Sequence, residues 1–377
     1  MWHGWRELWI SAILGAVLGL VAGCGVSTPS GVVDGNVDPD PIAAQSKRIS
    51  GEPNDSFDTA LDILYDDSGI ARIQGTINPN SDIDMYNLGP MTAGDRIRVD
   101  LAGLGTLDAA IIIFDDLGRI FIENDDRNYA ANQWDPFVNE VVRHDGINYF
   151  LGVGSAPLAP SMGIYNATIV VSRGEPVPPP TPQAIKLDFD GGTISIPGDR
   201  TYTVGAFNAA TIDPAYTGQT AAVERSITET IESNYQGLAL ELYSTSGPLP
   251  PFGEQTSPVL FGGTNPDAFG ISQTVDAYNQ NRTDGAIIFT DMFDRTRFGR
   301  VLTVDELGRA IGNVASHEIG HLLGLNHVTD PAYIMDTVGG PSTLLADQIF
   351  GVAPLHEMIW PFGYQDSILL LLETLGF

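Results

Sequence analysis

The sequence feature that most constrains this chain is the string HEIGHLLGLNH at residues 317–327. It contains three of the six histidines in the 377-residue chain. Upstream, Thr303 is followed three places later by Glu306, which is the pattern of a helix-capping box. Apolar residues then recur at helical spacing, at Val304, Leu307, Ile311 and Val314. We therefore expect one helix to begin at Thr303 and to carry the first two of these histidines.

The same helical spacing places Glu318 and His321 on the face that should be buried. Burying them unpaired would cost several kcal/mol, so a compensating partner is expected. His317 and His321 are four residues apart and share one face. Gly324 can adopt the left-handed conformation that ends a helix, which lets His327 approach the same point. Three imidazoles predict a tetrahedral Zn²⁺ site that leaves the fourth position to water.

A carboxylate beside such a site predicts hydrolysis. Zinc lowers the pKa of a bound water to about 7. Glu318, adjacent to His317, can take the proton of this water and pass it to a leaving amine. The alternative is a helix end with ordinary core histidines. Because the string fixes five residue identities within eleven positions, the metal site is favoured.

The string resembles the metzincin signature H-E-x-x-H-x-x-G-x-x-H at every fixed position. This resemblance implies a zinc endopeptidase of α+β fold, with a mixed sheet and a long active-site helix. Met335 lies in Tyr333-Ile334-Met335-Asp336 at a spacing similar to that of matrixins, and would form a hydrophobic floor below the metal. Val328, after the third histidine, is not a characteristic subfamily residue, so the subfamily stays open. The family binds substrate along a sheet edge, for which SPVLFGGT (257–264) is the candidate.

The segment from Gly51 to Ser172 has a different pattern, with short strands between turn signals. Its β-branched and aromatic runs predict an all-β sandwich. The expected strands are residues 71–77, 96–101, 109–115, 147–153 and 164–171.

Short motifs in this segment resemble the bacterial pre-peptidase C-terminal (PPC) domain, a β-sandwich that accompanies secreted proteases. They are an opening Glu-Pro-Asn-Asp, an Asp-x-Asp-x-Tyr and a closing Gly-x-Tyr. Some members bind calcium, which prefers hard oxygen ligands. The alternative is a set of solvated acidic turns. The candidate calcium ligands are Glu52, Asn54, Asp55, Asp82 and Asp84.

Proline density at residues 173–183 predicts an extended spacer and a domain boundary. Residues 184–377 mix strand and helix patterns and form the expected peptidase domain. The predicted organisation is therefore multidomain. It comprises a signal peptide (1–23), a flexible tether (24–50), the sandwich (51–172), the spacer (173–183) and the peptidase (184–377).

The only cysteine, Cys24, follows a short apolar run and closes Val21-Ala22-Gly23-Cys24, which resembles a bacterial lipobox. Lipidation of Cys24 would anchor the exported protein to a bacterial membrane, with the outer membrane or cell surface expected. The alternative is an ordinary secretory signal. A formal charge of −29 argues against nucleic-acid partners. We expect a monomer that acts on protein or peptide substrates.

Two other functions remain open at this stage. One is a surface binding or adhesion lipoprotein with a vestigial metal site. The other is a zinc amidase that acts on cell-wall bridges. His144 and His356 stand alone in the sequence and are interpreted as ordinary residues.

Overall fold

The computed structural model describes residues 51–377 except 129–130, 158 and 248–254. The expected signal peptide (1–23), Cys24 and the tether (24–50) lie outside the described residues. Among the helices that are described, none has the length and apolar character needed to cross a membrane.

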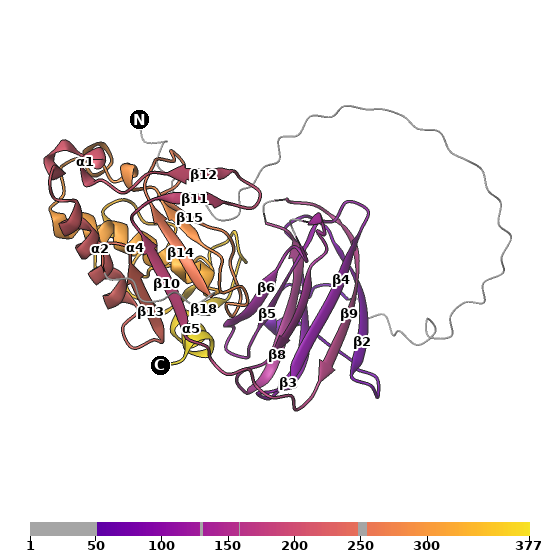
Figure 1. The fold of residues 1–377 in the computed structure, drawn as a ribbon. Coiled ribbons are helices and arrows are strands. Elements are labelled where there is room, and N and C mark those ends of the chain that lie inside the picture. Colours follow the sequence, from indigo (N-terminus) through magenta and orange to yellow (C-terminus); the bar gives the residue numbers. More distant parts are fainter. Residues whose placement is uncertain (1–50, 129–130, 158, 248–254) are drawn as a thin grey trace, which may run out of the picture.

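Residues 61–172 form two sheets that face each other (Figure 1). Neighbouring strands are antiparallel, except for the parallel pair β1–β3. The first sheet has the order β1 (Leu61–Asp62), β3 (Ile83–Met91), β8 (Gly146–Ser155), β5 (Ala109–Phe114) and β6 (Ile120–Asn124). The second has the order β2 (Ile70–Ile77), β9 (Gly163–Ser172), β4 (Arg96–Leu104) and β7 (Phe137–Val141).

Each of the five expected strands of this segment is present, at β2, β4, β5, β8 and β9. The sequence did not reveal β1, β3, β6 or β7. Strand β3 reads IDMYNLGPM, and its Asp, Asn, Gly and Pro are residues that strands generally lack. Tertiary pairing with β8 overrides that local preference.

Strand β5, with the sequence AAIIIF, is buried on both faces. Ala109, Ile111 and Ile113 belong to the core between the two sheets. The alternate residues Ala110, Ile112 and Phe114 belong to a second core, which continues into the rest of the chain. Because successive side chains in a strand point to opposite faces, the first sheet is covered on both sides.

The rest of the chain forms a mixed sheet with helices packed on it (Figure 1). Its strands run parallel except for the antiparallel strand β15. The order is β13 (Leu240–Ser244), β10 (Gln183–Asp188), β14 (Thr256–Phe261), β16 (Ala286–Ile288) and β15 (Gly270–Ser272). Two small hairpins accompany it, β11 (Gly192–Ser195) with β12 (Thr201–Val204), and β17 (Val352–Pro354) with β18 (Tyr364–Asp366).

The α-helices of the described chain all follow residue 208. They are α1 (Ala209–Ile212), α2 (Thr220–Asn234), α3 (Arg295–Phe298), α4 (Val304–Leu322) and α5 (Ser367–Leu375). Short 3₁₀ helices occur at Phe57–Thr59, Pro214–Tyr216, Thr290–Met292 and Thr343–Leu345.

The expectation that residues 257–264 lie at a sheet edge is wrong. Strand β14 is hydrogen-bonded to β10 on one side and to β16 on the other, so it is a central strand. Its residues Val259, Leu260 and Phe261 are all buried, as expected for a parallel strand covered on both faces. The edges of this sheet are β13 and β15.

Helix α4 begins as predicted. The Thr303 hydroxyl accepts a hydrogen bond from the Glu306 N–H, and the Glu306 carboxylate accepts one from the Thr303 N–H. Two glycines of α4, Gly308 and Gly312, let this helix approach α2 closely. A Cβ added at Gly312 would lie 2.6 Å from the Cβ of Thr230, so this position has no room for a side chain.

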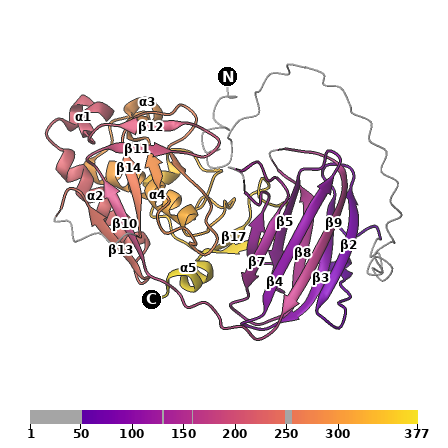
Figure 2. The same cartoon turned by 45° about the vertical axis from the view of Figure 1, so that its right-hand side comes forward.

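The proline-rich residues 173–182 contain no helix or strand and connect two parts that lie against each other (Figures 1 and 2). The Glu175 N–H donates to Gly94 O at 2.7 Å, and the Thr181 N–H donates to Thr374 O at 2.8 Å. The connecting segment is thus hydrogen-bonded to the sandwich near its start and to α5 near its end.

The interpretation of His144 as a solitary residue is wrong. Its Nδ1 lies 2.8 Å from the Glu373 carboxylate of α5, and its Nε2 lies 3.3 Å from the Asp115 carboxylate of the sandwich. These two carboxylates, Asp115 foremost, raise the pKa of His144 to about 9. His144 is therefore a charged link between the two parts of the chain, formed by residues far apart in sequence.

We predict that His144 stabilises the fold most at low pH. Its folded pKa of about 9 exceeds the ordinary value of 6.5, so the contribution is complete below pH 6.5 and is lost as pH rises through 9. In urea unfolding at pH 6, the free energy of unfolding of His144→Gln should be lower than that of the wild type. This deficit should exceed the deficit at pH 10 by on the order of 2 kcal/mol. A difference that does not change with pH would contradict this role.

Candidate metal centre

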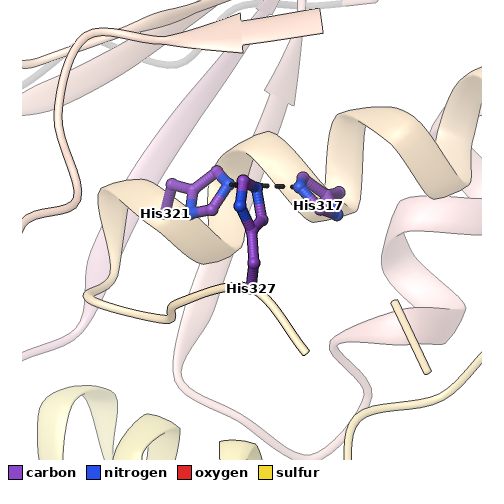
Figure 3. Close-up of side chains that lie close together, drawn as sticks. All are labelled: His317, His321 and His327. Atoms are coloured by element: carbon purple, nitrogen blue, oxygen red, sulfur yellow. Dashed lines mark hydrogen bonds between the residues drawn. The ribbon is translucent and has the colours of Figure 1, made fainter. Parts of the chain in front are cut away.

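The three histidines of the 317–327 string come together in the structure (Figure 3). His317 and His321 project from α4. The chain then turns at Gly324, whose φ is +92°, and returns His327 to the same point. The Nε2 atom of His321 lies 3.1 Å from that of His317 and 3.0 Å from that of His327. The predicted convergence is therefore present.

Backbone carbonyls orient two of these rings. The Nδ1 of His317 lies 2.7 Å from Ile334 O, and the Nδ1 of His321 lies 2.7 Å from Leu325 O. A carbonyl only accepts, so each Nδ1 carries the proton and each Nε2 presents a lone pair. Burial lowers the pKa of His317 to about 4 and that of His321 to about 3. Both rings are thus held neutral, as a metal ligand must be.

The donor set fits Zn²⁺. Bonds of about 2.0–2.1 Å in a tetrahedron place ligand nitrogens about 3.4 Å apart, and the observed separations of 3.0 and 3.1 Å are close to this value. The Nε2 atoms of His317, His321 and His327 thus lie slightly closer together than they would around a bound ion. A cation between them would relieve the mutual repulsion of their lone pairs. Three nitrogen ligands also leave a fourth position for water or substrate.

Glu318 lies beside the histidines and against the edge strand β15. Its carboxylate accepts a hydrogen bond from the Ser272 N–H, while Oε2 has no protein partner among the described residues. A Cβ added at Gly270 would lie 2.8 Å from Glu318 Oε1, so only glycine leaves the carboxylate this space. Burial raises the pKa of Glu318 well above its ordinary value, which favours a group that can hold a proton.

Met335 packs directly beneath the helix that carries the ligands. It is fully buried, and its Sδ would lie 2.5 Å from a Cβ added at Gly320. The Val328 N–H donates to Met335 O at 2.9 Å, which ties the residue after the third histidine to this turn. Met335 therefore packs against the helical turn that joins His317 to His321.

Sequence reasoning missed the residues that hold His327 in place. Gln365, which is fully buried, accepts from the Asn326 N–H at 2.6 Å and donates to Asn326 O at 2.8 Å. The His356 N–H donates to His327 O at 3.0 Å, so His356 also lies beside the site. No motif near residues 356–365 marks this role, because these hydrogen bonds go to the backbone of residues that are distant in sequence.

Three of the five candidate calcium ligands gather in one place. Carboxylate oxygens of Glu52, Asp55 and Asp82 lie within 4.8 Å of one another. Asp84 is buried and accepts a hydrogen bond from Tyr165 at 2.5 Å. Asn54 is 1% exposed, and its Oδ1 has no protein partner among the described residues.

Residues 193–346 match the matrixin peptidase family, which confirms the resemblance found in the sequence and supports a zinc metallopeptidase. A comparison with curated proteins finds no match. Solved structures that are similar include the pre-peptidase C-terminal domain of a Bacillus anthracis collagenase, at 13% identity over 30% of this chain and 94% of that chain, with a TM-score of 0.23.

Two other solved structures are similar to this chain at the same level. A zinc-dependent peptidase from Methanocorpusculum labreanum shows 14% identity over 44% of this chain and 93% of that chain, with a TM-score of 0.26. The periplasmic lysozyme inhibitor PliG of Aeromonas hydrophila shows 13% identity over 30% of this chain and 96% of that chain, with a TM-score of 0.25.

We predict that Gly320→Ala destabilises the protein, although glycine to alanine within a helix normally stabilises by about 1 kcal/mol. The added Cβ would push Met335 away from α4, at an overpacking cost of about 1–3 kcal/mol. Thermal unfolding should show a lower midpoint than the wild type. Gly205→Ala is the control, because a Cβ there meets no atom within 4 Å. An unchanged or raised midpoint for Gly320→Ala would refute the close contact.

Proposed function

We propose that the chain is a zinc endopeptidase of metzincin type. The observation that carries this proposal is the convergence of the Nε2 atoms of His317, His321 and His327 beside the buried carboxylate of Glu318. A site that only held zinc would gain nothing from that carboxylate. Burying it costs free energy, which is understandable if the group moves protons in a reaction.

The zinc ion, when bound by the three histidines, supplies a water of lowered pKa and polarises the scissile carbonyl. The protein's own contribution centres on Glu318. Its carboxylate, fixed by the Ser272 N–H, takes a proton from the attacking water and returns it to the leaving amine. The raised pKa of Glu318 suits the interval between these steps, when the carboxyl group holds the proton.

Strand β15 is the proposed site of substrate binding, in place of β14. It is the edge strand beside α4, and it uses one side to pair with β16. Ser272 of β15 donates to Glu318, so a peptide that extends this edge would pass next to the catalytic carboxylate. Backbone pairing of this kind recognises an extended chain without a specific sequence.

The lipobox-like Val21-Ala22-Gly23-Cys24 supports a proposed location at a bacterial membrane surface, through lipid on Cys24. The matrixin match favours a peptidase over an adhesion protein. A zinc amidase would share the same ligands and carboxylate. Digestion of purified cell wall beside an unstructured protein would separate these two activities.

We predict that Glu318→Gln abolishes proteolysis but keeps zinc. Zinc-loaded wild type should cleave an unstructured protein such as casein, and the variant should be slower by a factor of about 10²–10⁴. Both proteins should retain one zinc ion by elemental analysis, because Glu318 is not a ligand. Wild type that binds no zinc would refute the metal centre, whereas equal cleavage by both proteins would refute the role of Glu318.

We further propose a calcium site in the sandwich, formed by Glu52, Asp55 and Asp82 with Asn54 and Asp84. The specific observation is the buried Oδ1 of Asn54, which has no protein partner among the described residues and belongs to the residue before Asp55 in the chain. Burial and the charges of neighbouring aspartates raise the pKa of Glu52. A cation would offset that repulsion and supply a partner for the amide oxygen.

We predict that calcium raises the thermal midpoint of the wild type, since a ligand that binds only the folded state stabilises it. Asp82→Asn should remove most of this increase. Asp67→Asn is the control, because Asp67 is an exposed turn residue outside the cluster. A midpoint that calcium leaves unchanged in all three proteins would refute the calcium site.

A further inference from the structure

The hairpin β17–β18 connects the third histidine to the sandwich. The His356 N–H, just after β17, donates to His327 O, and the Thr329 N–H donates to Pro354 O at 3.1 Å. Val328 also pairs with Leu355 in an antiparallel bridge. The backbone on the C-terminal side of His327 is therefore fixed by this hairpin.

The second strand of the hairpin fixes the other side of His327. Gln365 of β18 exchanges two hydrogen bonds with the backbone of Asn326. Its Nε2 also lies 3.2 Å from the Ser367 hydroxyl. His327 follows the helix and has no helical hydrogen bonds of its own, so its position depends on where β17 and β18 lie.

The loop between these two strands is inserted against the outer face of the sandwich. Trp360 is 3% exposed and packs over Gly152 and Gly154 of β8. A Cβ added at Gly152 would lie 2.7 Å from the indole, and one at Gly154 would lie 3.1 Å from it. Since residues two apart in a strand share a face, the two glycines form one slot for the ring.

Aromatic contacts hold the rest of the loop. Phe362 lies 5.3 Å from Phe57 and 6.1 Å from Phe114, measured between ring centroids. The Tyr364 N–H donates to Gly118 O at 2.9 Å, which joins β18 to the turn before β6. The loop is therefore held against the sandwich by the fit of the Trp360 ring over two glycines and by a backbone hydrogen bond, as well as by apolar burial.

The indole Nε1 of Trp360 has no hydrogen-bond partner among the described residues, although it is buried. A buried N–H without a partner is costly, so a smaller apolar side chain would be favoured if apolar burial were the only requirement. The large indole ring is instead explained by the slot above Gly152 and Gly154, which it fills.

We propose that the sandwich is a structural part of the catalytic centre, and that Trp360 is a positioning residue acting on His327 through the β17–β18 hairpin. This inference rests on the proposed zinc peptidase function. It assigns to the first domain a role in the reaction of the second. A sandwich that merely accompanied the peptidase would not need to contact the segment that orients a metal ligand.

The test compares Trp360→Ala with Trp134→Ala in the full chain. Trp134 is a matched control, because it is 45% exposed on a sandwich loop. Zinc affinity is measured by competition with a chromogenic chelator, beside kcat and KM for casein cleavage. Trp360→Ala should weaken zinc binding about 10-fold, the usual effect of losing a residue that orients a ligand. It should also lower kcat with KM changed less than twofold, whereas Trp134→Ala should match the wild type.

Trp360→Phe and Gly154→Ala keep the test decisive if Trp360→Ala fails to fold. Phenylalanine refills part of the slot and should restore much of the zinc affinity. Gly154→Ala leaves the ring in place but presses on it, and should weaken zinc binding without loss of helix or strand content by circular dichroism. If the variants that fold have the zinc affinity and kcat of the wild type, the positioning role is refuted. If the wild type itself binds no zinc, the proposed function is refuted instead.

Discussion

The burial of two imidazoles and one carboxylate near the end of α4 is the constraint on which the rest of the metal centre depends. His317, His321 and Glu318 are nearly inaccessible to solvent, and burial alone disfavours every charged form of these groups. Carbonyl groups compensate the protons on two rings, and the Ser272 N–H compensates one oxygen of the carboxylate. The lone pairs of the Nε2 atoms have no such partner and lie close together, and this arrangement is what a cation site requires.

Close approach around this centre depends on glycines that have no unusual backbone conformation. Gly320 admits Met335 beneath the helix, Gly270 leaves room for Glu318, and Gly312 lets α2 approach α4. At each of these positions a methyl group would meet a neighbouring side chain at 2.5–2.8 Å, well inside van der Waals contact. The orientation of the histidines and of Glu318 is therefore maintained by the absence of side chains at defined positions, as well as by hydrogen bonds.

The two halves of the chain share a core. The outer face of the first sandwich sheet contributes Met85, Ile112 and Phe114 to the same apolar cluster as the peptidase helices. His144 adds a charged contact to α5, and Arg143 lies 3.5 Å from the centre of the Tyr278 ring. A proline-rich connection usually indicates independent domains. Here the continuous apolar run of β5 indicates the opposite, because a strand with one solvent-exposed face would alternate.

The sequence by itself determined the local parts of the site. A capping box, a helical apolar spacing and a glycine after the last turn were sufficient to predict the start of α4, the shared face of His317 and His321, and the return of His327. These features act over a few residues, where propensity and periodicity decide the conformation. Only the tertiary structure decided what lies around the site. The choice of β15 as sheet edge, the contact of Gln365 with Asn326, the link of His144 to Glu373 and the slot for Trp360 each join residues far apart in sequence. No local pattern encodes such contacts, because they depend on the packing of whole sheets against each other.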